Sequence, residues 1–346
     1  MTAMTQAPPR GVLPGGLSPV IVGYGHAGCN LHHRSLRSVA GGDPAVIAVD
    51  PMSPTRPGPG LQWVPTLAAA LTTVDITRSV FHVATPVHAH RTTVDALASA
   101  GARYIILEKP IAPSVADAQD IAAIAASGVQ IVPMSVWLSS AVTARIEADI
   151  AIGRIGSLSA LHLEQSKPRF RRSSQRDAHQ SALEVELPHQ LLLALHLAGP
   201  VAAMTDVKLW PMILPDGAEL PGMGGVTLTL THTNGVISTL VSDLTAPVRI
   251  RRLRMSGNAG EVIAHFPVSG ADDVGQLHLP GQPGRVLVQD APLTRFIGEA
   301  YRYFAGLMDR PPSGDLLMHL RVAELMAAAA QSAERPSHRE ITQSSW

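Results

Sequence analysis

Three glycines at a fixed spacing near the start of the chain constrain its fold more than any other feature. The apolar run 19–22 reads as a buried strand. Gly23, Gly25 and Gly28 then form a G-x-G-x-x-G turn that opens a helix, which is predicted to end before Gly41. In this context Gly23 allows a tight turn, Gly25 lets a pyrophosphate approach the backbone, and Gly28 lets the helix pack on the strand. The helix N-terminus adds free N–H groups for phosphate oxygens. The segment therefore predicts a dinucleotide site.

A carboxylate stands where the adenosine ribose of such a cofactor would lie. A second apolar run, 45–49, ends in Asp50, at the usual distance of about 20 residues beyond the glycine turn. An acid at this point accepts hydrogen bonds from the ribose hydroxyls and repels a 2′-phosphate. The sequence therefore predicts NAD as the cofactor, with NADP less favoured. Arg56, in the proline-rich loop that follows, is the residue that could reverse this preference.

Composition and charge exclude several other classes of protein. The chain of 346 residues has 27 basic and 27 acidic side chains, so it lacks the positive field that binds nucleic acid or anionic membranes. No apolar run is long enough to span a membrane. The single cysteine, Cys29, cannot form an internal disulfide and no Cys/His spacing indicates a metal site, so we expect no metal and a cytoplasmic location. Residues 1–18 have no apolar stretch and are predicted to be a disordered leader rather than a secretory signal.

Strand and helix patterns alternate from residue 19 to residue 134. Near-continuous apolar strands of this kind are typical of a parallel sheet with helices on both faces. Ligands of such sheets bind at the carboxyl ends of the strands, and Asp50, Thr85-Pro86 and Glu108-Lys109-Pro110 all follow predicted strand ends. Besides the two strands already named, we expect strands at 78–84, 104–107 and 129–132 and helices at 92–100 and 115–126.

From about residue 135 the pattern changes and strands dominate. Asn234-Gly235 between two alternating runs is a strong hairpin signal, and short returns predict an antiparallel sheet. One face of this sheet, which includes the threonines of 226–231, is expected to lack a helix layer, so we predict a homodimer or homotetramer. The expected helices are 141–152, 182–198, 292–309 and 314–333, and the expected strands are 158–164, 205–214, 226–231, 236–242, 250–255, 261–266 and 285–288.

Glu108-Lys109-Pro110 is the most specific of several motifs that point to one family. The others are 23–28, 84–90, 153–156, 255–260 and the helix after His189. Together they resemble the Gfo/Idh/MocA oxidoreductases, named after glucose–fructose oxidoreductase, inositol dehydrogenase and a rhizopine-catabolism protein. The resemblance implies an N-terminal Rossmann domain, a doubly wound parallel sheet, at 19–134. It also implies a C-terminal α+β domain on an open, mostly antiparallel sheet at 135–346, with the active site in the cleft between the two domains.

The resemblance also implies roles for individual residues. Lys109 and His189 are expected to be catalytic, because an ammonium can hydrogen-bond a reacting oxygen and an imidazole suits acid–base chemistry on an alcohol. Both are also expected to bind a small polyhydroxylated substrate, together with Glu186 and with Trp137, whose ring could stack on a sugar face. The expected cofactor-binding residues are Gly23, Tyr24, Gly25, His26, Ala27, Gly28, Asp50, Ala84, Thr85, Pro86, His88, Glu108 and Lys109.

Departures from the family pattern leave the function open. Val87 stands where the family often has Asn, and Val185 and Leu192 stand where it usually has Asp, so the usual acidic partners of His189 are missing. We expect an oxidoreductase that interconverts a secondary alcohol and a ketone on a sugar, amino sugar or cyclitol. The high Ala, Arg and Pro content indicates a GC-rich genome and favours a context of specialised metabolism such as aminoglycoside-like antibiotic biosynthesis. The alternatives are a ketone or imine reductase of a biosynthetic pathway and a catalytically silent NAD-binding regulator.

Several of these residues also have purely structural interpretations. Lys109 could form an ion pair with a neighbouring carboxylate, and His189 could merely cap or pack its helix. Glu186 could be a solvated acid in the first helical turn, and Trp137 could be an ordinary core residue. The basic cluster 167–172 is either a solvated loop or a loop that reaches a polar or anionic substrate.

Overall fold

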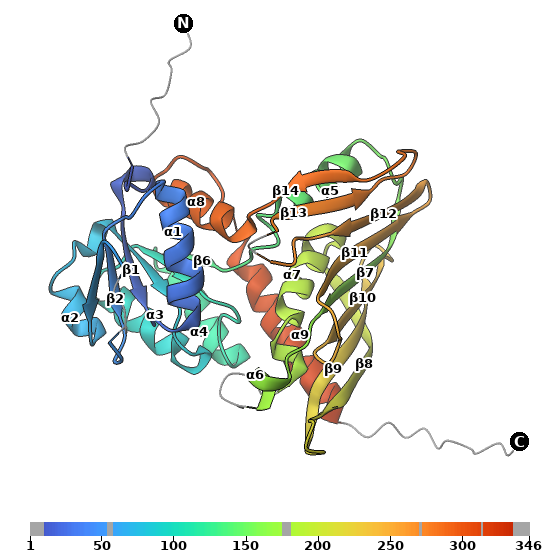
Figure 1. The fold of residues 1–346 in the computed structure, drawn as a ribbon, viewed down its shortest axis with the longest axis horizontal. Coiled ribbons are helices and arrows are strands. Elements are labelled where there is room, and N and C mark those ends of the chain that lie inside the picture. Colours follow the sequence, from blue (N-terminus) through green and yellow to red (C-terminus); the bar gives the residue numbers. More distant parts are fainter. Residues whose placement is uncertain (1–9, 54–57, 175–180, 270–271, 313, 335–346) are drawn as a thin grey trace, which may run out of the picture.

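The computed structural model describes residues 10–53, 58–174, 181–269, 272–312 and 314–334 (Figure 1). The chain builds one sheet of six strands and another of eight, with helices between and around them. The predicted fold class, a Rossmann sheet followed by an open and mostly antiparallel sheet, is confirmed. Within the described ranges, no helix has both the length and the apolar character needed to cross a lipid bilayer.

The first sheet is parallel throughout and has the strand order β3-β2-β1-β4-β5-β6. The chain runs outward from β1 to β3 and then crosses back to β4, so the order reverses between β1 and β4. Ligands bind at this switch point, outside the carboxyl ends of the strands. The strands are β1 (Ser18–Val22), β2 (Val46–Val49), β3 (Leu61–Val64), β4 (Ser79–Val83), β5 (Tyr104–Leu107) and β6 (Gln130–Pro133).

Alternate side chains of the central strands face two different layers of helices. Val20 and Val22 of β1 pack in one apolar cluster, whereas Ile21 packs in another. Because both faces are covered, these strands are apolar along their whole length. The first cluster includes residues of α2 (Leu67–Leu71), α3 (His90–Ser99) and α4 (Val115–Ala126), and the second includes residues of α1 (Arg34–Ala40) and α8 (Pro292–Phe304).

Two segments outside the predicted domain limits complete the second of these layers. α8 buries Phe296 and Tyr301 against the first sheet, although it comes late in the chain. The 3-10 turn η1 (Pro14–Gly16) contacts α8, and the neighbouring Leu13 and Leu17 are 3% and 8% exposed. The expectation of a disordered leader is therefore wrong for residues 10–17, because two leucines there pack on an apolar surface, and residues 1–9 lie outside the described residues.

The second sheet has the strand order β14-β13-β12-β11-β7-β10-β9-β8. Its pairs are antiparallel except β7 with β10, which run parallel. The strands are β7 (Leu158–Ser166), β8 (Val201–Ile213), β9 (Glu219–His232), β10 (Ile237–Asp243), β11 (Ile250–Gly257), β12 (Gly260–His265), β13 (Val274–His278) and β14 (Val286–Gln289).

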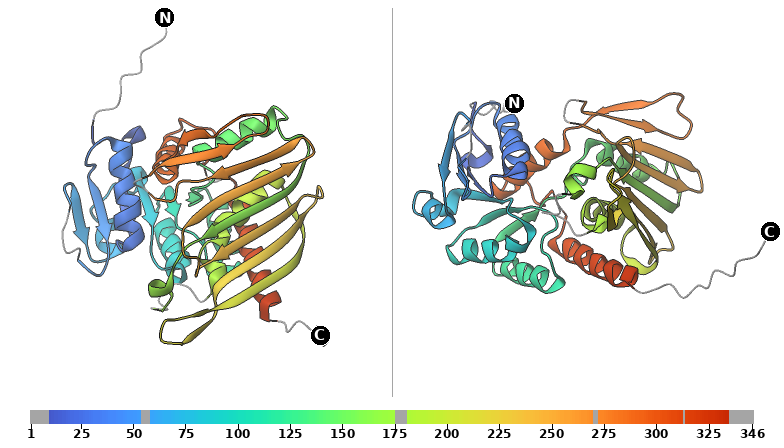
Figure 2. Two further views of the ribbon diagram at one scale, coloured as in Figure 1. Left: turned by 45° about the vertical axis from the view of Figure 1, so that its right-hand side comes forward. Right: turned by 60° about the horizontal axis from the view of Figure 1, so that its bottom comes forward.

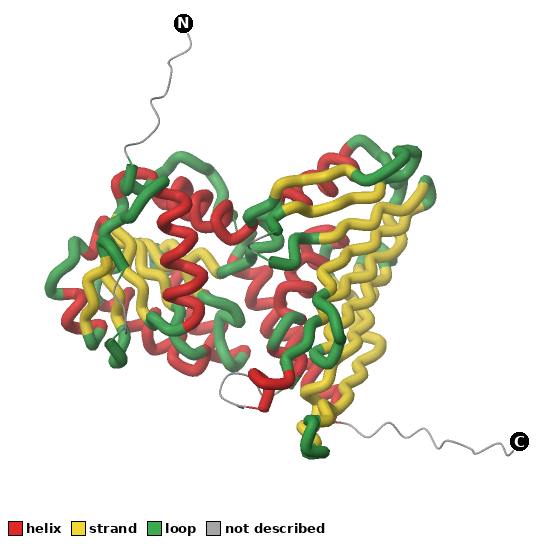
Figure 3. Tube along the Cα trace, viewed as in Figure 1, coloured by secondary structure: helices red, strands yellow, loops and turns green. Residues whose placement is uncertain are grey.

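Helices cover only one face of the second sheet (Figures 1 and 3). Leu161 and Leu163 of β7 share a core with α7 (Leu187–Ala198) and α9 (Leu316–Glu334), while the alternating residues point to the other face. α5 (Ala141–Ala151) packs beside β13 and β14. The left view of Figure 2 shows the second face without a helix layer. α9 lies between the two sheets, since Leu325 belongs to the second core and Leu320 packs against the first.

The structure departs from the predicted elements in several places. The helix expected over 182–198 is a 3-10 turn, η5 (Ala182–Glu184), followed by α7. Pro188 is accommodated in the first turn of α7, where a backbone N–H has no partner to lose. β3, α2, β13 and α6 (Phe170–Ser174) were not predicted, and each has only four or five residues.

Candidate functional site

The glycine turn after β1 is shaped by close backbone contacts. Gly23 has a φ of +92°, and a Cβ there would lie 2.7 Å from the carbonyl group of Ala84 at the end of β4. A Cβ on Gly28 would lie 2.1 Å from the carbonyl oxygen of Gly23, so the helix rests directly on the turn. At Gly25, by contrast, a Cβ would meet no atom within 4 Å. The turn is therefore closed by two glycines and leaves open space in front of the third, which is the space that a pyrophosphate needs.

The helix after this turn contains a π-type segment, η2 (Gly28–His33), before it continues as α1. Such wide turns occur often at functional sites. Tyr24, in the turn itself, is hydrogen-bonded through its Oη to His33 Nδ1. Burial raises the pKa of Tyr24, so the phenol stays protonated. His26 is exposed.

Asp50 and Thr85 bring polar groups to the same edge of the first sheet. Asp50 Oδ2 accepts a hydrogen bond from the Tyr24 backbone N–H over 2.7 Å, and Oδ1 accepts one from Met52 over 2.9 Å. The carboxylate thus lies beside the glycine turn and keeps lone pairs for further donors. Thr85 Oγ1 is buried and has no hydrogen-bond partner among the described residues. The open space at Gly25, the Asp50 carboxylate and this hydroxyl fit a bound dinucleotide.

Behind the strand ends, four buried polar side chains form a hydrogen-bonded chain that was not predicted. His32 Nε2 lies 3.0 Å from Glu108 Oε1, His32 Nδ1 lies 2.8 Å from His82 Nδ1, and His82 Nε2 lies 3.0 Å from Tyr301 Oη. Burial alone would raise the pKa of Glu108, but the contacts with His32 and the charge of Lys109 lower it to about 2. The ionised Glu108 accepts a hydrogen bond from His32, and the tautomers of the two imidazoles set the directions of the other two hydrogen bonds.

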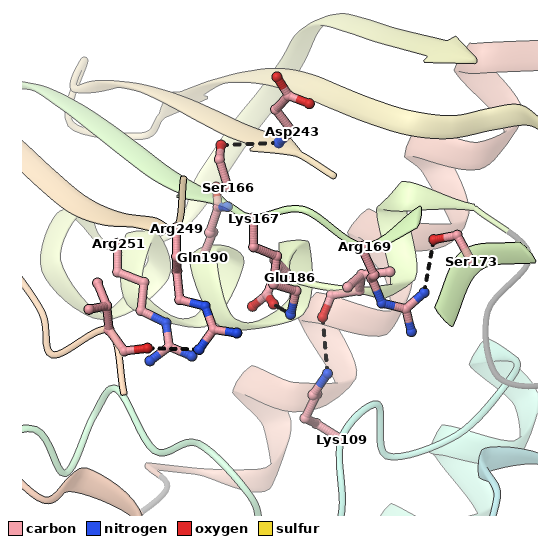
Figure 4. A network of polar contacts seen from close by, with 12 residues as sticks. Lys109, Ser166, Lys167, Arg169, Ser173, Glu186, Gln190, Asp243, Arg249 and Arg251 are labelled. Carbon is pink, nitrogen blue, oxygen red and sulfur yellow. Dashed lines mark hydrogen bonds and ion pairs between the residues drawn. The ribbon is translucent and has the colours of Figure 1, made fainter. Parts of the chain in front are cut away.

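Lys109 joins the two halves of the molecule. It follows Glu108 at the carboxyl end of β5, and its backbone N–H donates to Glu108 Oε2 over 3.1 Å. The Lys109–Pro110 peptide bond is cis. The ammonium donates to the carbonyl oxygen of Val185, between η5 and α7, over 3.1 Å (Figure 4). Its direct hydrogen bond is therefore with a backbone carbonyl of the second sheet's helix layer and not with a carboxylate.

Glu186, next to Val185, is 7% exposed and forms an ion pair with Lys167 (Figure 4). Burial alone would raise the pKa of Glu186, but the charges of Lys167 and His189 lower it to about 2. With the Gln165 amide nitrogen turned toward the carboxylate, Gln165 donates to Glu186 Oε2 over 2.8 Å. Glu186 is therefore an ionised, buried group, and its interpretation as a solvated first-turn acid is wrong.

His189 lies in the first turn of α7. Its Nδ1 is buried and has no hydrogen-bond partner among the described residues. Burial and the charge of Lys109 lower the pKa of His189 to about 3. The charge of Glu186 raises this pKa, but by less than burial and Lys109 lower it. The imidazole is therefore neutral near physiological pH, and a neutral ring with an unpartnered nitrogen can accept a proton from a hydroxyl.

Trp137 supports this site from the core. It is 4% exposed, and its ring packs edge-on against Phe266 and His189 at centroid distances of 4.5 and 6.4 Å. The Arg251 guanidinium lies 5.3 Å from the centre of the same ring. The expectation that Trp137 stacks on a sugar face is therefore wrong, because protein groups enclose the ring.

Two arginines bring further positive charge to this region. Arg169 is 7% exposed, and Arg251 is partly buried on β11 beside Gln165 of β7. Figure 4 shows both near the Lys167–Glu186 pair. The basic cluster 167–172 thus turns Lys167 and Arg169 inward, whereas its last two arginines are exposed. The solvated-loop interpretation holds only for the second half of the cluster.

A comparison with family models covers the first sheet and its helices. Residues 18–134 match the Gfo/Idh/MocA oxidoreductase family, described as having an NAD-binding Rossmann fold. The matched stretch contains the glycine turn, Asp50 and Lys109. This stretch of the chain therefore resembles the Gfo/Idh/MocA family. The first sheet accordingly matches an NAD-binding Rossmann fold.

Solved structures resemble this chain over almost its whole length. An oxidoreductase from Agrobacterium radiobacter in complex with NAD+, L-tartaric acid and magnesium has a TM-score of 0.72 at 16% identity, covering 92% of this chain and 96% of that one. Levoglucosan dehydrogenase in complex with NADH and L-sorbose has a TM-score of 0.70 at 17% identity, with coverages of 92% and 96%. UDP-N-acetylglucosamine 3-dehydrogenase from Acidithiobacillus ferrooxidans has a TM-score of 0.67 at 20% identity, with coverages of 92% and 97%.

These likenesses establish the two-sheet fold and leave the substrate open, since all three identities are low. No curated protein sequence matches the chain.

The remaining residues of the predicted site differ in their placement. Ala84 and Thr85 follow β4, whereas Pro86 and His88 are exposed. His90 is buried between two backbone carbonyls, with Nε2 3.0 Å from the oxygen of Thr85 and Nδ1 3.2 Å from that of Ile111, and so links two strand-end loops. Among the residues that the structure describes, no three His, Cys, Asp or Glu side chains are grouped to hold a metal ion.

The positions that depart from the Gfo/Idh/MocA pattern are buried. Val185 is 4% exposed and acts through its backbone carbonyl, which accepts from Lys109. Leu192 is 2% exposed and packs in the core of the second sheet. Neither position can supply a carboxylate to His189, and the acids that act on it through their charges are Glu186 and, more weakly, Glu108.

Proposed function

We propose that this protein is an NAD(P)-dependent oxidoreductase that interconverts a secondary alcohol and a ketone on a sugar, amino sugar or cyclitol. The observation that carries the proposal is the hydrogen bond from Lys109, at the carboxyl edge of the first sheet, to the carbonyl oxygen of Val185, just before the helix that carries His189. Two proteins of similar fold are named for sugar substrates, levoglucosan and UDP-N-acetylglucosamine, which supports a polyhydroxylated substrate.

The residues of the site would have separate roles. The backbone at Gly25 would approach the pyrophosphate and Asp50 would accept the ribose hydroxyls. When bound, the nicotinamide supplies or accepts the hydride. Lys109 donates a hydrogen bond to the reacting oxygen and stabilises negative charge that develops there. His189 accepts the hydroxyl proton during oxidation and returns it during reduction.

Two buried networks hold these groups in position. The hydrogen-bonded chain from Tyr301 through His82 and His32 orients the Glu108 carboxylate, which in turn binds the backbone N–H of Lys109. On the other side, the ion pair with Lys167 fixes Glu186 at the start of the helix that carries His189. Catalytic side chains held in this way need little rearrangement during the reaction.

A substrate panel monitored by NADH absorbance tests the proposal. The panel contains sugars, amino sugars and cyclitols with their keto forms, and also simple ketones and imines. Amino sugars and cyclitols are assayed first, because the high Ala, Arg and Pro content of the chain favours an aminoglycoside-like pathway. Turnover of a polyhydroxylated compound supports the proposal, and turnover restricted to simple ketones or imines supports a biosynthetic reductase. Saturable NADH binding without turnover of any compound would favour a silent NAD-binding regulator.

A further inference from the structure

Four buried or partly buried cations from separate segments of the chain lie around Glu186 (Figure 4). They are Lys109 after β5, Lys167 after β7, Arg169 before α6 and Arg251 in β11. Burial lowers the pKa of Lys167, and the positive charges of Lys109 and Arg251 lower it further. Burial also lowers the pKa values of Arg169 and Arg251. Much of this positive charge is therefore removed from water.

The protein neutralises this charge only in part. Glu186 forms an ion pair with Lys167. The Arg169 guanidinium donates to the hydroxyl of Ser173 over 3.2 Å, and that of Arg251 donates to a backbone carbonyl oxygen over 2.8 Å. In the described part of the chain, neither guanidinium forms an ion pair, although each carries five N–H donors. The charge of Glu186 acts on both guanidiniums as well as on Lys167. One carboxylate shared among three cations leaves net positive charge in a region partly removed from water, so the arrangement favours binding of an anion.

Arg251 faces the side of the second sheet that carries His189. On β11 it shares a face with the buried Leu253 and Met255, whereas Arg254 points to the open face, where it is exposed. The charge of Arg251, like that of Lys109, acts on His189. A guanidinium matches two oxygens of a carboxylate or phosphate at once.

We propose that the substrate carries an anionic group, a carboxylate or a phosphate, which Arg251 and Lys167 bind while Lys109 and His189 act on the neighbouring carbinol. The inference rests on the proposed function and narrows its substrate class to acidic or phosphorylated polyhydroxylated compounds. A neutral sugar would leave Glu186 as a single carboxylate shared among Lys167, Arg169 and Arg251.

Calorimetric titration of the NADH-saturated protein tests this assignment with three probes. D-glucuronate and D-glucose share a pyranose ring and differ in a carboxylate, and inorganic phosphate is the third probe. Saturation with NADH prevents phosphate from binding at the glycine turn. We expect glucuronate to bind more tightly than glucose and phosphate to compete with glucuronate. Arg251→Met and Lys167→Met should each weaken glucuronate binding about 10–100-fold, whereas Arg254→Met, on the other face of the same strand, should not change it.

The anion assignment is overturned if the wild-type protein binds glucose and glucuronate with equal affinity. It is also overturned if Arg251→Met and Lys167→Met both bind glucuronate as tightly as the wild-type protein does. Either result leaves the oxidoreductase proposal standing. If Arg251→Met does not fold by circular dichroism, Arg251→Lys takes its place, because Lys cannot form the two parallel bonds. Unchanged affinity in Arg251→Lys and Lys167→Met then overturns the assignment. Failure of the wild-type protein to bind NADH, measured first, instead contradicts the proposed function.

Discussion

The buried imidazole of His189 predicts a defined loss of stability in acid. Burial and the charge of Lys109 lower its pKa from 6.5 to about 3 in the folded protein. Below pH 6.5 the unfolded chain therefore binds a proton that the folded protein does not bind. The contribution of His189 to stability is complete above pH 6.5 and is lost as the pH falls toward 3. Each pH unit in this window lowers the free energy of unfolding by about 1.4 kcal/mol, which gives about 2 kcal/mol at about pH 5.

Replacing His189 with Gln removes this titration. Urea unfolding at about pH 8 and at about pH 5 gives the loss of unfolding free energy between these two pH values for each protein. The loss in the wild-type protein minus the loss in His189→Gln is the contribution of His189. Other buried histidines, such as His82, contribute equally to the pH-dependent loss of stability in both proteins, so their contributions cancel in the difference. Glu186, with a pKa of about 2, stays ionised between about pH 8 and about pH 5. We expect the wild-type protein to lose about 2 kcal/mol more than His189→Gln.

The exposed His88 provides the matched control, and His88→Gln should keep the wild-type pH dependence. An equal loss of stability in the wild-type protein and His189→Gln would refute the reasoning, because the folded protein would then bind a proton at His189 as readily as the unfolded chain.

Lys109→Ala should lower turnover of a panel substrate about 10²–10⁴-fold and leave NADH affinity nearly unchanged. Steady-state kinetics beside a cofactor titration measure both quantities, and near-wild-type turnover would show that Lys109 does not act on the reacting oxygen. Asp50 should make NAD bind more tightly than NADP. Titration with both dinucleotides decides this, since Arg56, which could favour a 2′-phosphate, lies outside the described residues. The open face of the second sheet, where Ile237 is 49% exposed, should be covered by a second copy of the chain. Light scattering at micromolar concentration should give the mass of a dimer or tetramer, and a monomer mass would contradict this expectation.

Most of the first sheet is predictable from sequence because local signals and tertiary environment agree there. β5 and α4 have the predicted bounds, since β5 is apolar along most of its length and Ser114 caps α4 by accepting a hydrogen bond from the Asp117 N–H. β3 and α2 escape prediction because only Val64 and Ala70 in them are buried, so neither carries an apolar run of useful length.

The candidate site is less predictable than the fold. Lys109 stands out through its motif and its place at a strand end. The buried chain from Glu108 to Tyr301 joins residues that are 76 and 219 positions apart, and no local pattern encodes such contacts. The available signal was His82, an ionisable residue between Phe81 and Val83 in a buried strand. Arg251 can be assigned to the helix-covered face only once β11 is known to pair with β7, because alternation defines two faces without saying which is inside.

Binding of NADH tests the central claim most directly, because it needs no knowledge of the substrate. A Val side chain at position 25 would fill the open space in front of the glycine turn, so Gly25→Val should lose the cofactor while remaining folded by circular dichroism. Fluorescence titration should show saturable NADH binding by the wild-type protein and Lys109→Ala, and none by Gly25→Val. Absence of binding by the wild-type protein, or undiminished binding by Gly25→Val, would contradict the account of the site.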